Sequence, residues 1–399
     1  MRSDKSRPSP VPSHLSGSPA PHRLRIAYVI NSVEGGGAAL PVPAVTRVLR
    51  DHGAEVRLFA LTPRDRRALP PIAESGLEAE VREGGERDHL AAYAWLDRAI
   101  RRYAPDCIWT SLTRATAIGQ MVGLRRGIPV VSWQHAAYLK PANLRLLRAT
   151  RNLSTLWVAD SESVAALTAE RLRVPPGRLM TWPIFAADPT APVARPWRQG
   201  EALRVGSLGR LHRVKGYDVL VDALAILRAR GFEPAAPFEI VIGGEGGERE
   251  AIDAAARAAG LDMVRLAGFT DRPRDFLAGL HLYLQPSRSE GLCVAVHEAM
   301  QAGLPTIVSA VGEMPWSVQH GATGLVVPPA DPEALADALA AMLSAPDQLA
   351  AMGAASRQRV LDRFSVAAFS AAGGSVLERL DALVRAGPRF SRPANDRSV

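Results

Sequence analysis

The strongest constraint on the fold of this chain is an alternation of short apolar runs with segments of helical periodicity. The first series opens with the apolar run at 25–32, followed by a glycine-rich turn, a helical segment and a second apolar run at 55–61. Further strands are predicted at 107–112, 130–135 and 155–160, and helices at 88–103, 114–126, 142–151 and 161–172. Such alternation is typical of a parallel sheet covered by helices on both faces.

A second series of the same kind follows. Its strands are predicted at 203–209, 238–244, 264–268, 282–287, 305–310 and 324–328. The proline-rich stretch 186–202 breaks the rhythm between the two series, so we place an interdomain linker there. The predicted fold class is α/β, with two Rossmann-like doubly wound domains facing each other across a cleft.

The predicted domain boundaries follow from this rhythm. An N-terminal domain is expected at 23–185 and a C-terminal domain at 203–364, followed by a helix at 365–386. Residues 1–22 and 387–399 lack periodicity and are expected to be disordered tails. A length of 399 residues is also more than one compact core of typical size requires.

Charge and cysteine content exclude several classes of protein. The formal charge is +8, but the arginines are dispersed and no zinc-finger or RNA-binding pattern is present, so no nucleic-acid partner is expected. Cys107 and Cys293 offer neither a disulfide framework nor a metal cluster. No stretch approaches the ~20 uninterrupted apolar residues that a membrane-crossing helix needs, and the opening segment lacks the apolar block of a signal peptide. A cytoplasmic location is therefore expected.

The turn Gly209–Gly216 is the sharpest motif in the sequence. It places Arg210 and Lys215 at the carboxyl end of a predicted strand, where a helix begins. Helix-start amides carry partial positive charge, and two cations beside them suit a diphosphate. The alternative is an exposed basic loop, but Lys215 is one of only three lysines in the chain.

A second motif follows the predicted strand at 282–287. Glu290 lies in a loop and Glu298 about one turn into the next helix, with the amides of 291–293 between them. Two carboxylates so placed can accept hydrogen bonds from sugar and ribose hydroxyls. The alternative is that both glutamates only cap and solvate a helix start.

Together these motifs resemble the C-terminal half of the family-4 retaining glycosyltransferases, also called glycosyl transferases group 1, which have the GT-B fold. The matching segments occur in the family's order and spacing: GRLHRVKGYDVLVDAL, IVIGGEG, LAGF and LYLQPSRSEGLCVAVHEAMQAGLPTIVSAVG. The resemblance implies that Arg210 and Lys215 hold the donor diphosphate, Glu290 the transferred sugar and Glu298 the nucleotide ribose. It further implies donor contacts at Gly209, Gly244, Phe269, Gly291, Leu292 and Cys293.

The first half resembles the same family more weakly, and by that resemblance it is the acceptor domain. His135 matches the family's histidine near the sugar, although a strand-end histidine bonded to a backbone carbonyl is the alternative. Gly36 and Gly37 match a glycine-rich loop that approaches the donor. Three departures stand out: Cys293 occupies a position that is often glycine, 182–185 (WPIF) replaces an Asn-Gly turn, and the segment after Gly37 (AALPVPAV) lacks the charged residues common there, which leaves the acceptor unassigned.

The chemistry that the resemblance implies needs no cofactor and no metal. The sequence has no Asp-x-Asp tripeptide to hold a divalent ion, and the cations at Arg210 and Lys215 can stabilise the departing diphosphate instead. Retention is implied to proceed with a donor phosphate oxygen accepting the proton, without a protein nucleophile. The resemblance leaves the donor base and sugar open, with UDP among the nucleotides expected. Most family members build surface polysaccharides, lipopolysaccharides or glycolipids, so a glycan or lipid-linked acceptor is expected.

The sequence also bears on alternative functions of other classes. An NAD-dependent oxidoreductase is disfavoured, because Arg249 stands where the third glycine of the dinucleotide fingerprint belongs. A nucleotide-sugar epimerase or a phosphorylase of the same fold, and a non-catalytic sugar-binding relic, remain open. Peripheral membrane contact is a further hypothesis, since Arg145, Arg148 and Arg151 recur at three-residue spacing on one predicted helix. The alternative there is a solvated helix face.

Overall fold

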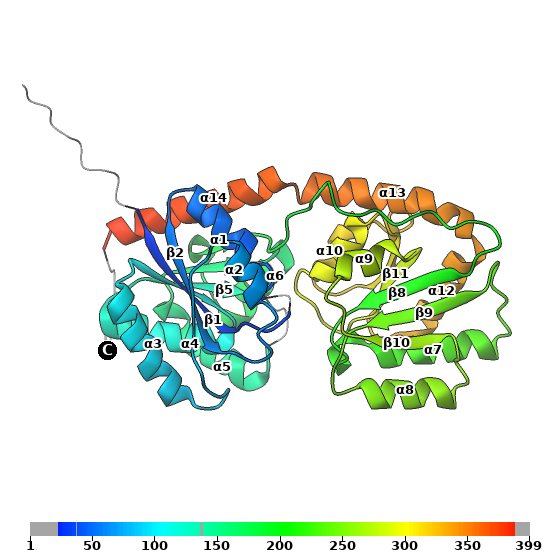
Figure 1. Cartoon of the computed structure of the whole chain (residues 1–399), viewed down its shortest axis with the longest axis horizontal. Coiled ribbons are helices and arrows are strands. Elements are labelled where there is room, and N and C mark those ends of the chain that lie inside the picture. The colour runs from blue at the N-terminus through cyan, green and yellow to red at the C-terminus, as the bar shows by residue number, and fades with distance from the viewer. Residues whose placement is uncertain (1–22, 37, 136–138, 388–399) are drawn as a thin grey trace, which may run out of the picture.

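The computed structural model describes residues 23–36, 38–135 and 139–387. The tail predicted at 1–22, nearly all of that predicted at 387–399, and Gly37 of the predicted donor loop lie outside the described residues. Figure 1 shows two α/β domains side by side, joined along one edge by the linker and by the last two helices.

The first domain contains a seven-stranded parallel sheet in the order β3-β2-β1-β4-β5-β6-β7. Its strands are β1 (Arg25–Ser32), β2 (Glu55–Thr62), β3 (Ala79–Val81), β4 (Cys107–Ser111), β5 (Val130–Gln134), β6 (Leu156–Ala159) and β7 (Leu179–Thr181). Its longer helices are α1 (Val42–Asp51), α2 (Leu69–Glu74), α3 (His89–Tyr103), α4 (Thr113–Arg126), α5 (Pro141–Thr150) and α6 (Glu162–Leu172). The edge strands β3 and β7 were not predicted, because three residues carry too little apolar pattern.

The second domain contains a six-stranded parallel sheet in the order β10-β9-β8-β11-β12-β13. Its strands are β8 (Leu203–Leu208), β9 (Phe238–Gly243), β10 (Val264–Gly268), β11 (Leu282–Gln285), β12 (Thr306–Ser309) and β13 (Gly324–Val327). Its helices are α7 (Tyr217–Ala229), α8 (Arg249–Ala258), α9 (Pro273–Ala278), α10 (Val294–Gln301), α11 (Met314–Ser317), α12 (Pro332–Ser344) and α13 (Pro346–Arg363). The predicted fold class is confirmed.

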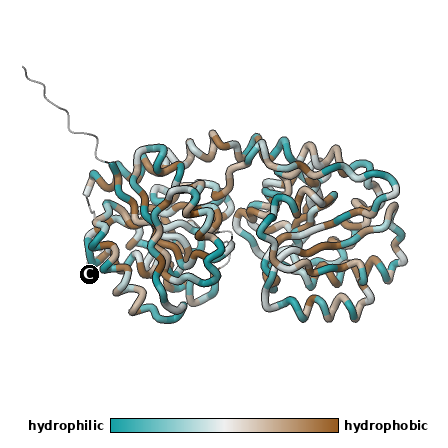
Figure 2. Tube along the Cα trace, viewed as in Figure 1, coloured by the Kyte–Doolittle hydropathy of each residue, from teal (hydrophilic) through white to brown (hydrophobic). Residues whose placement is uncertain are grey.

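Continuous apolar runs place the central strands between two layers of helices. Every residue of β4 and β5 is buried, as expected for a parallel sheet covered on both faces. Helix α1 buries Val42, Val45 and Leu49, which the helical period brings to one face. In Figure 2 the hydrophobic stretches concentrate in the interior strands, whereas the outer helices alternate between hydrophobic and hydrophilic residues.

Strand order determines where the functional loops meet. Each sheet reverses its winding once, between β1 and β4 in the first domain and between β8 and β11 in the second. At such a point the loops after the two central strands diverge and leave room for a ligand at the carboxyl edge. The motif 209–216 follows β8 and Glu290 follows β11, so both lie at the switch point of the second sheet.

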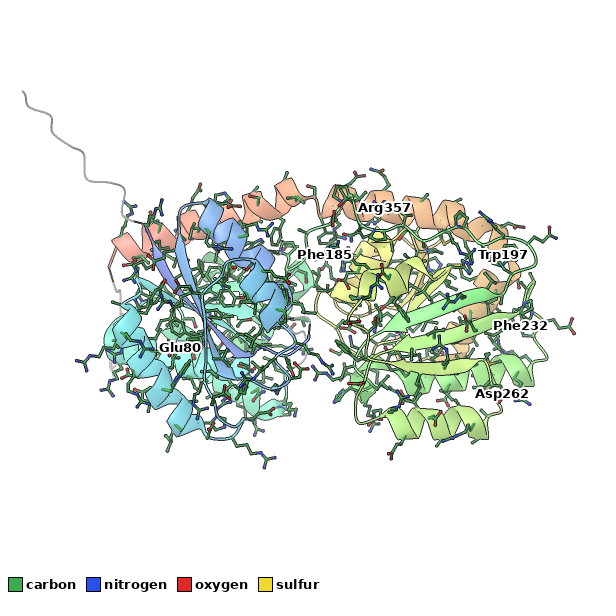
Figure 3. The ribbon with its side chains drawn as sticks, in the orientation of Figure 1. Glu80, Phe185, Trp197, Phe232, Asp262 and Arg357 are labelled. Atoms are coloured by element: carbon green, nitrogen blue, oxygen red, sulfur yellow. The ribbon has the colours of Figure 1, made fainter. Side chains whose placement is uncertain are left out.

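The linker predicted at 186–202 is bound along the second domain rather than free. The Ala187 amide donates to the Phe364 carbonyl oxygen at 2.7 Å, and the Ala194 amide donates to the Ala302 carbonyl oxygen at 2.7 Å. Phe185, which Figure 3 shows at the junction of the two domains, packs against Phe364 and His297. These contacts restrict how the domains can move relative to one another.

The last helix, α14 (Val366–Arg385), returns to the first domain and lies across it (Figure 1). The rings of Phe369 and Trp182 lie 5.4 Å apart, and a Cβ added at Gly373 would come within 2.4 Å of the Trp182 ring. Among the described residues, one helical stretch, Pro346–Arg385, is long and apolar enough to cross a membrane. It is formed by α13 and α14, and α14 packs against α1 of the first domain, burying Phe369, Val376 and Leu380.

Candidate functional site

Two glycines let the loops after β8 and β9 pack directly on one another. Gly244 has φ +144°, and a Cβ there would lie 1.9 Å from the Gly209 carbonyl oxygen. A Cβ at Gly209 would lie 2.8 Å from the Tyr217 hydroxyl and 3.4 Å from Lys215 Cε. The structure therefore gives both predicted donor-binding glycines a packing role, because their missing side chains allow Lys215 to reach the end of the sheet.

Lys215 and Glu290, predicted from two separate motifs, form an ion pair. Lys215 Nζ lies 2.7 Å from Glu290 Oε1, and the side chains are 21% and 11% exposed. Burial by itself lowers the pKa of the Lys215 ammonium, but the Glu290 carboxylate outweighs burial and holds that pKa above its ordinary value. A fixed cation and a fixed carboxylate thus stand side by side at the switch point.

The loop that carries Lys215 is held by a glycine in the left-handed conformation. Gly216 has φ +69°, and a Cβ there would lie 2.0 Å from the Pro286 carbonyl oxygen. Any other residue would push this turn away from the loop that follows β11. Gly216 therefore fixes the distance between the two motifs.

Arg210 differs from Lys215 in its surroundings. It lies in the same turn but is exposed, and it makes no ion pair or side-chain hydrogen bond with any part of the chain that the structure describes. Only one of the two predicted cations is therefore fixed by protein contacts in this structure, and the other is left to reach a ligand.

The predicted donor loop 291–293 touches the first domain. A Cβ at Gly291 would lie 2.2 Å from the His135 carbonyl oxygen, so only glycine fits between the two domains here. Leu292 and Cys293 are buried, and Cys293 precedes α10 with φ +61°. That left-handed backbone gives a physical reason why glycine suits this position. Burial raises the pKa of the Cys293 thiol, so the thiol is neutral.

Glu298 stands apart from the Lys215–Glu290 pair. No residue that the structure describes forms an ion pair or side-chain hydrogen bond with it. Burial raises its pKa from 4.5 to about 7, against a smaller opposing effect of Arg274. A largely buried carboxyl without a protein partner is suited to receive hydroxyl groups of a ligand.

His135 directly follows β5 and is held by both ring nitrogens. Nδ1 lies 2.8 Å from Asp160 Oδ1, Nε2 is hydrogen-bonded to the Ser111 hydroxyl, and the ring stacks on Trp133. The sequence did not predict these partners. Ser111 ends β4 and Asp160 follows β6, so both meet His135 only through the order of the strands in the sheet.

Of the remaining predicted donor contacts, Phe269 lies at the domain boundary. The Arg67 guanidinium lies 3.8 Å from the Phe269 ring centroid, and Arg67 Nη2 lies 3.7 Å from Glu245 Oε2. Phe269 thus contacts the opposite domain in this structure. Gly36 has open space where a Cβ would stand. Within the described residues no three metal-ligating side chains of His, Cys, Asp or Glu gather.

The helix expected to carry a basic stripe is α5. Arg145 is exposed, but Arg151 donates to the carbonyl oxygens of Arg148 and Arg173, and Leu147 is buried. The three arginines therefore do not form one free stripe. The exposed apolar residues here are Leu146 on α5 and, on the adjacent helix α4, Met121 and Leu124.

Comparison with protein families matches both halves of the chain. The model of Glycosyltransferase Family 4 matches residues 35–185, and the model of Glycosyl transferases group 1 matches residues 196–359. The chain is 29% identical over 374 residues to a D-inositol 3-phosphate glycosyltransferase of Thermobispora bispora, covering 80% of this chain and 85% of that protein. It is 37% identical over 188 residues to a GDP-mannose-dependent phosphatidylinositol monomannoside mannosyltransferase of Mycobacterium tuberculosis, covering 44% of this chain and 48% of that protein.

Solved structures share the fold. Anabaena HepE in complex with UDP-glucose superposes with a TM-score of 0.77 at 19% identity, covering 90% of this chain and all of that one. Sucrose-phosphate synthase from Thermosynechococcus elongatus gives a TM-score of 0.73 at 20% identity, with coverage of 90% and 100%. At these identities the likeness supports the architecture and not the substrate.

Proposed function

Since the chain belongs to the glycosyltransferases of group 1 and has the GT-B fold, we propose that it transfers a sugar from a nucleotide diphosphate donor with retention of anomeric configuration. The acceptor we propose is a glycan or glycolipid of the cell envelope, in the synthesis of polysaccharide or lipopolysaccharide at the cytoplasmic side of the membrane. The observation that carries the proposal is the Lys215–Glu290 ion pair at the switch point of the second sheet.

Under this proposal, the four charged residues that the motifs of the second domain supply all bind the donor. Lys215 and the exposed Arg210 hold the diphosphate, and Glu290 accepts hydrogen bonds from the transferred sugar. Glu298, a largely buried carboxyl for which the described residues offer no hydrogen-bond partner, accepts the ribose hydroxyls. The amides at the start of α10 add partial positive charge on the same side.

The chemistry follows from where the charge develops. As the bond between sugar and diphosphate breaks, negative charge grows on the diphosphate, and the two cations stabilise it without requiring a divalent ion. A phosphate oxygen of the donor accepts the proton of the acceptor hydroxyl on the face that the diphosphate leaves. His135 contacts the sugar from the first domain and supports its oxocarbenium-like state together with Glu290.

We further propose that the surface formed by α4 and α5 faces the membrane, which would suit a lipid-linked acceptor. Helices α4 and α5 pack together and contain arginines but no aspartate or glutamate, and they expose Met121, Leu124 and Leu146. The α4 arginines Arg114, Arg125 and Arg126 pair with Asp88 and Asp97, so Arg145 is the exposed arginine of this surface for which the described residues offer no acidic partner. Apolar side chains beside exposed arginines suit an anionic lipid surface. Flotation with vesicles of phosphatidylcholine and phosphatidylglycerol tests this: replacing Arg125 and Arg145 by Gln should reduce binding at low salt. Absence of binding by the parent protein would move soluble saccharide acceptors ahead.

The donor and the reaction are tested in two stages. A panel of nucleotide sugars, including UDP-glucose and GDP-mannose, is screened for the rise in melting temperature that a bound ligand causes by mass action. Release of free nucleotide is then measured with and without candidate acceptors, and the anomeric configuration of the product is read by NMR. Release only with acceptor supports transfer. Isomerised donor without nucleotide release indicates an epimerase, and an inverted product contradicts retention.

A further inference from the structure

We infer that Ser287 and Gln285 are positioning residues that fix the Glu290 carboxylate for the transferred sugar. The inference rests on the proposed function and deepens it, because it concerns how the sugar-binding carboxylate is held. It arises from a chain of side-chain hydrogen bonds that runs along β11 into the loop after it and ends at Glu290.

Alternation along the strand brings the members of this chain together. Tyr283, Gln285 and Ser287 are two residues apart, so they lie on one face of the extended segment, and all three are fully buried. The Tyr283 hydroxyl lies 2.8 Å from Gln285 Oε1, Gln285 Nε2 lies 2.8 Å from Ser287 Oγ, and Ser287 Oγ lies 2.6 Å from Glu290 Oε1. The Leu208 amide donates to the Tyr283 hydroxyl at 3.1 Å, which anchors the chain to β8.

Proton counting gives the chain a direction. A hydroxyl has one proton, and a carboxylate can only accept, so the Ser287 proton must go to Glu290. Ser287 Oγ then has to accept from Gln285, which requires the amide NH₂ of Gln285 to face Ser287 and its oxygen to face Tyr283. Only in this orientation does each side-chain donor and acceptor between Tyr283 and Glu290 have a hydrogen-bond partner. The buried network therefore specifies one position for Glu290.

The hydrogen bonds converge on a single oxygen of Glu290. Lys215 Nζ at 2.7 Å and Ser287 Oγ at 2.6 Å both contact Oε1, with Gln285 Nε2 farther away at 3.5 Å. The Cys293 thiol, a weak donor, is also hydrogen-bonded to Glu290. Among the described residues the strong donors therefore converge on Oε1, and Oε2 can accept from a sugar hydroxyl. Ser287 keeps Glu290 in place when the Lys215 ammonium also engages the diphosphate.

The first test is the substitution Ser287→Ala, which removes the hydrogen bond and little volume. Binding of UDP-glucose and GDP-mannose is compared with binding of UDP and GDP to the same protein, by calorimetry. The loss of a charge-assisted hydrogen bond should weaken nucleotide-sugar binding by about tenfold or more and leave nucleoside diphosphate binding within about twofold. Equal weakening of both ligands would overturn the inference.

A matched control is Ser154→Ala in the first domain. Ser154 is also fully buried and its hydroxyl lies 2.7 Å from that of Ser132, but it does not contact Glu290. This variant should lose thermal stability as Ser287→Ala does and retain the parental ratio of nucleotide-sugar to nucleotide affinity. If Ser154→Ala shifts that ratio equally, Ser287 has a structural role only.

The second test is Gln285→Glu, read by its pH dependence. When it is protonated, the new carboxyl can donate a hydrogen bond to Ser287, as the Gln285 amide does. When it is ionised, it repels the Glu290 carboxylate, whose Oε1 lies 3.5 Å from Gln285 Nε2 in the parent protein. The charged and titratable groups facing it are Lys215, Tyr217, Tyr283, Glu290 and Cys293. Turnover of Gln285→Glu should therefore fall as pH rises through the pKa of the new carboxyl, relative to the parent protein. A parallel pH profile would contradict the positioning role.

The outcomes separate this inference from the proposed function. If the parent protein binds no nucleotide sugar in the panel, the proposed function is wrong. If the parent protein binds one and Ser287→Ala binds it equally well, the proposed function stands and the positioning role is wrong.

Discussion

The Glu298 carboxyl allows a prediction in which stability and ligand binding are linked through one proton. Burial raises its pKa from 4.5 to about 7, whereas in the unfolded chain it ionises at its ordinary pKa. Between those two pH values the folded protein holds more protons than the unfolded one, so the free energy of unfolding falls as pH rises. The total change in the free energy of unfolding is up to about 3 kcal/mol, because a shift of one pKa unit corresponds to about 1.36 kcal/mol.

The perturbation is Glu298→Gln, which keeps the shape and removes the ionisation. Without nucleotide, the variant should match the parent protein near pH 4.5 and exceed its free energy of unfolding by about 2–3 kcal/mol at pH 8. Urea unfolding at a series of pH values measures this difference. Glu250→Gln, at an exposed position on α8, serves as the control and should leave the pH dependence of the parent protein unchanged. A constant difference between Glu298→Gln and the parent across this range would refute the reasoning.

The same carboxyl should couple nucleotide binding to pH. Ribose hydroxyls donate to the ionised carboxylate, so a bound nucleotide lowers the pKa of Glu298 and releases a proton near pH 6 to 7. Calorimetry of UDP or GDP binding in buffers of different ionisation enthalpy measures that proton. Glu298→Gln should bind without releasing it. Proton release that persists in the variant would assign the effect to another group.

The other predictions concern the turn after β8 and the requirement for metal. Lys215→Ala should lower the transfer rate by at least about 100-fold while the protein still folds, since it removes charge stabilisation of the departing diphosphate; turnover near that of the parent would contradict the diphosphate assignment. The substitution should also cost about 1–3 kcal/mol of stability in urea unfolding, because Glu290 loses its buried partner. Gly216→Ala should lower the free energy of unfolding by about 2 kcal/mol or more and should lower activity, because the backbone φ is +69° and the added Cβ would meet the Pro286 carbonyl oxygen. An unchanged melting temperature would argue against this packing. Chelation of divalent ions with EDTA should leave a substantial part of the transfer activity, and strict dependence on added magnesium or manganese would contradict the proposed role of the two cations.

Local pattern was enough to predict the central strands, the main helices around them and the two main motifs, but not the three-residue edge strands β3 and β7. The apolar runs at 25–32, 107–112 and 282–287 predict the strands β1, β4 and β11 to within about two residues, because buried parallel strands need continuous apolar runs. The pairing of a strand end with a helix start likewise marks the turn containing Lys215 and the loop containing Glu290. Such features lie within a few residues of chain, where sequence alone determines the geometry.

Contacts between distant segments were decided only by the tertiary structure. The sheet order brings Lys215 to Glu290, and Ser111 and Asp160 to His135, although each pair is separated by at least 24 residues. Gln285 and Ser287 read in the sequence as ordinary positions at a strand end. Their role emerges only from the buried hydrogen-bond network that joins Tyr283, Gln285 and Ser287 to Glu290. Burial also determines the raised pKa of Glu298, since the electrostatic environment of a carboxyl depends on everything packed around it rather than on its neighbours in the chain.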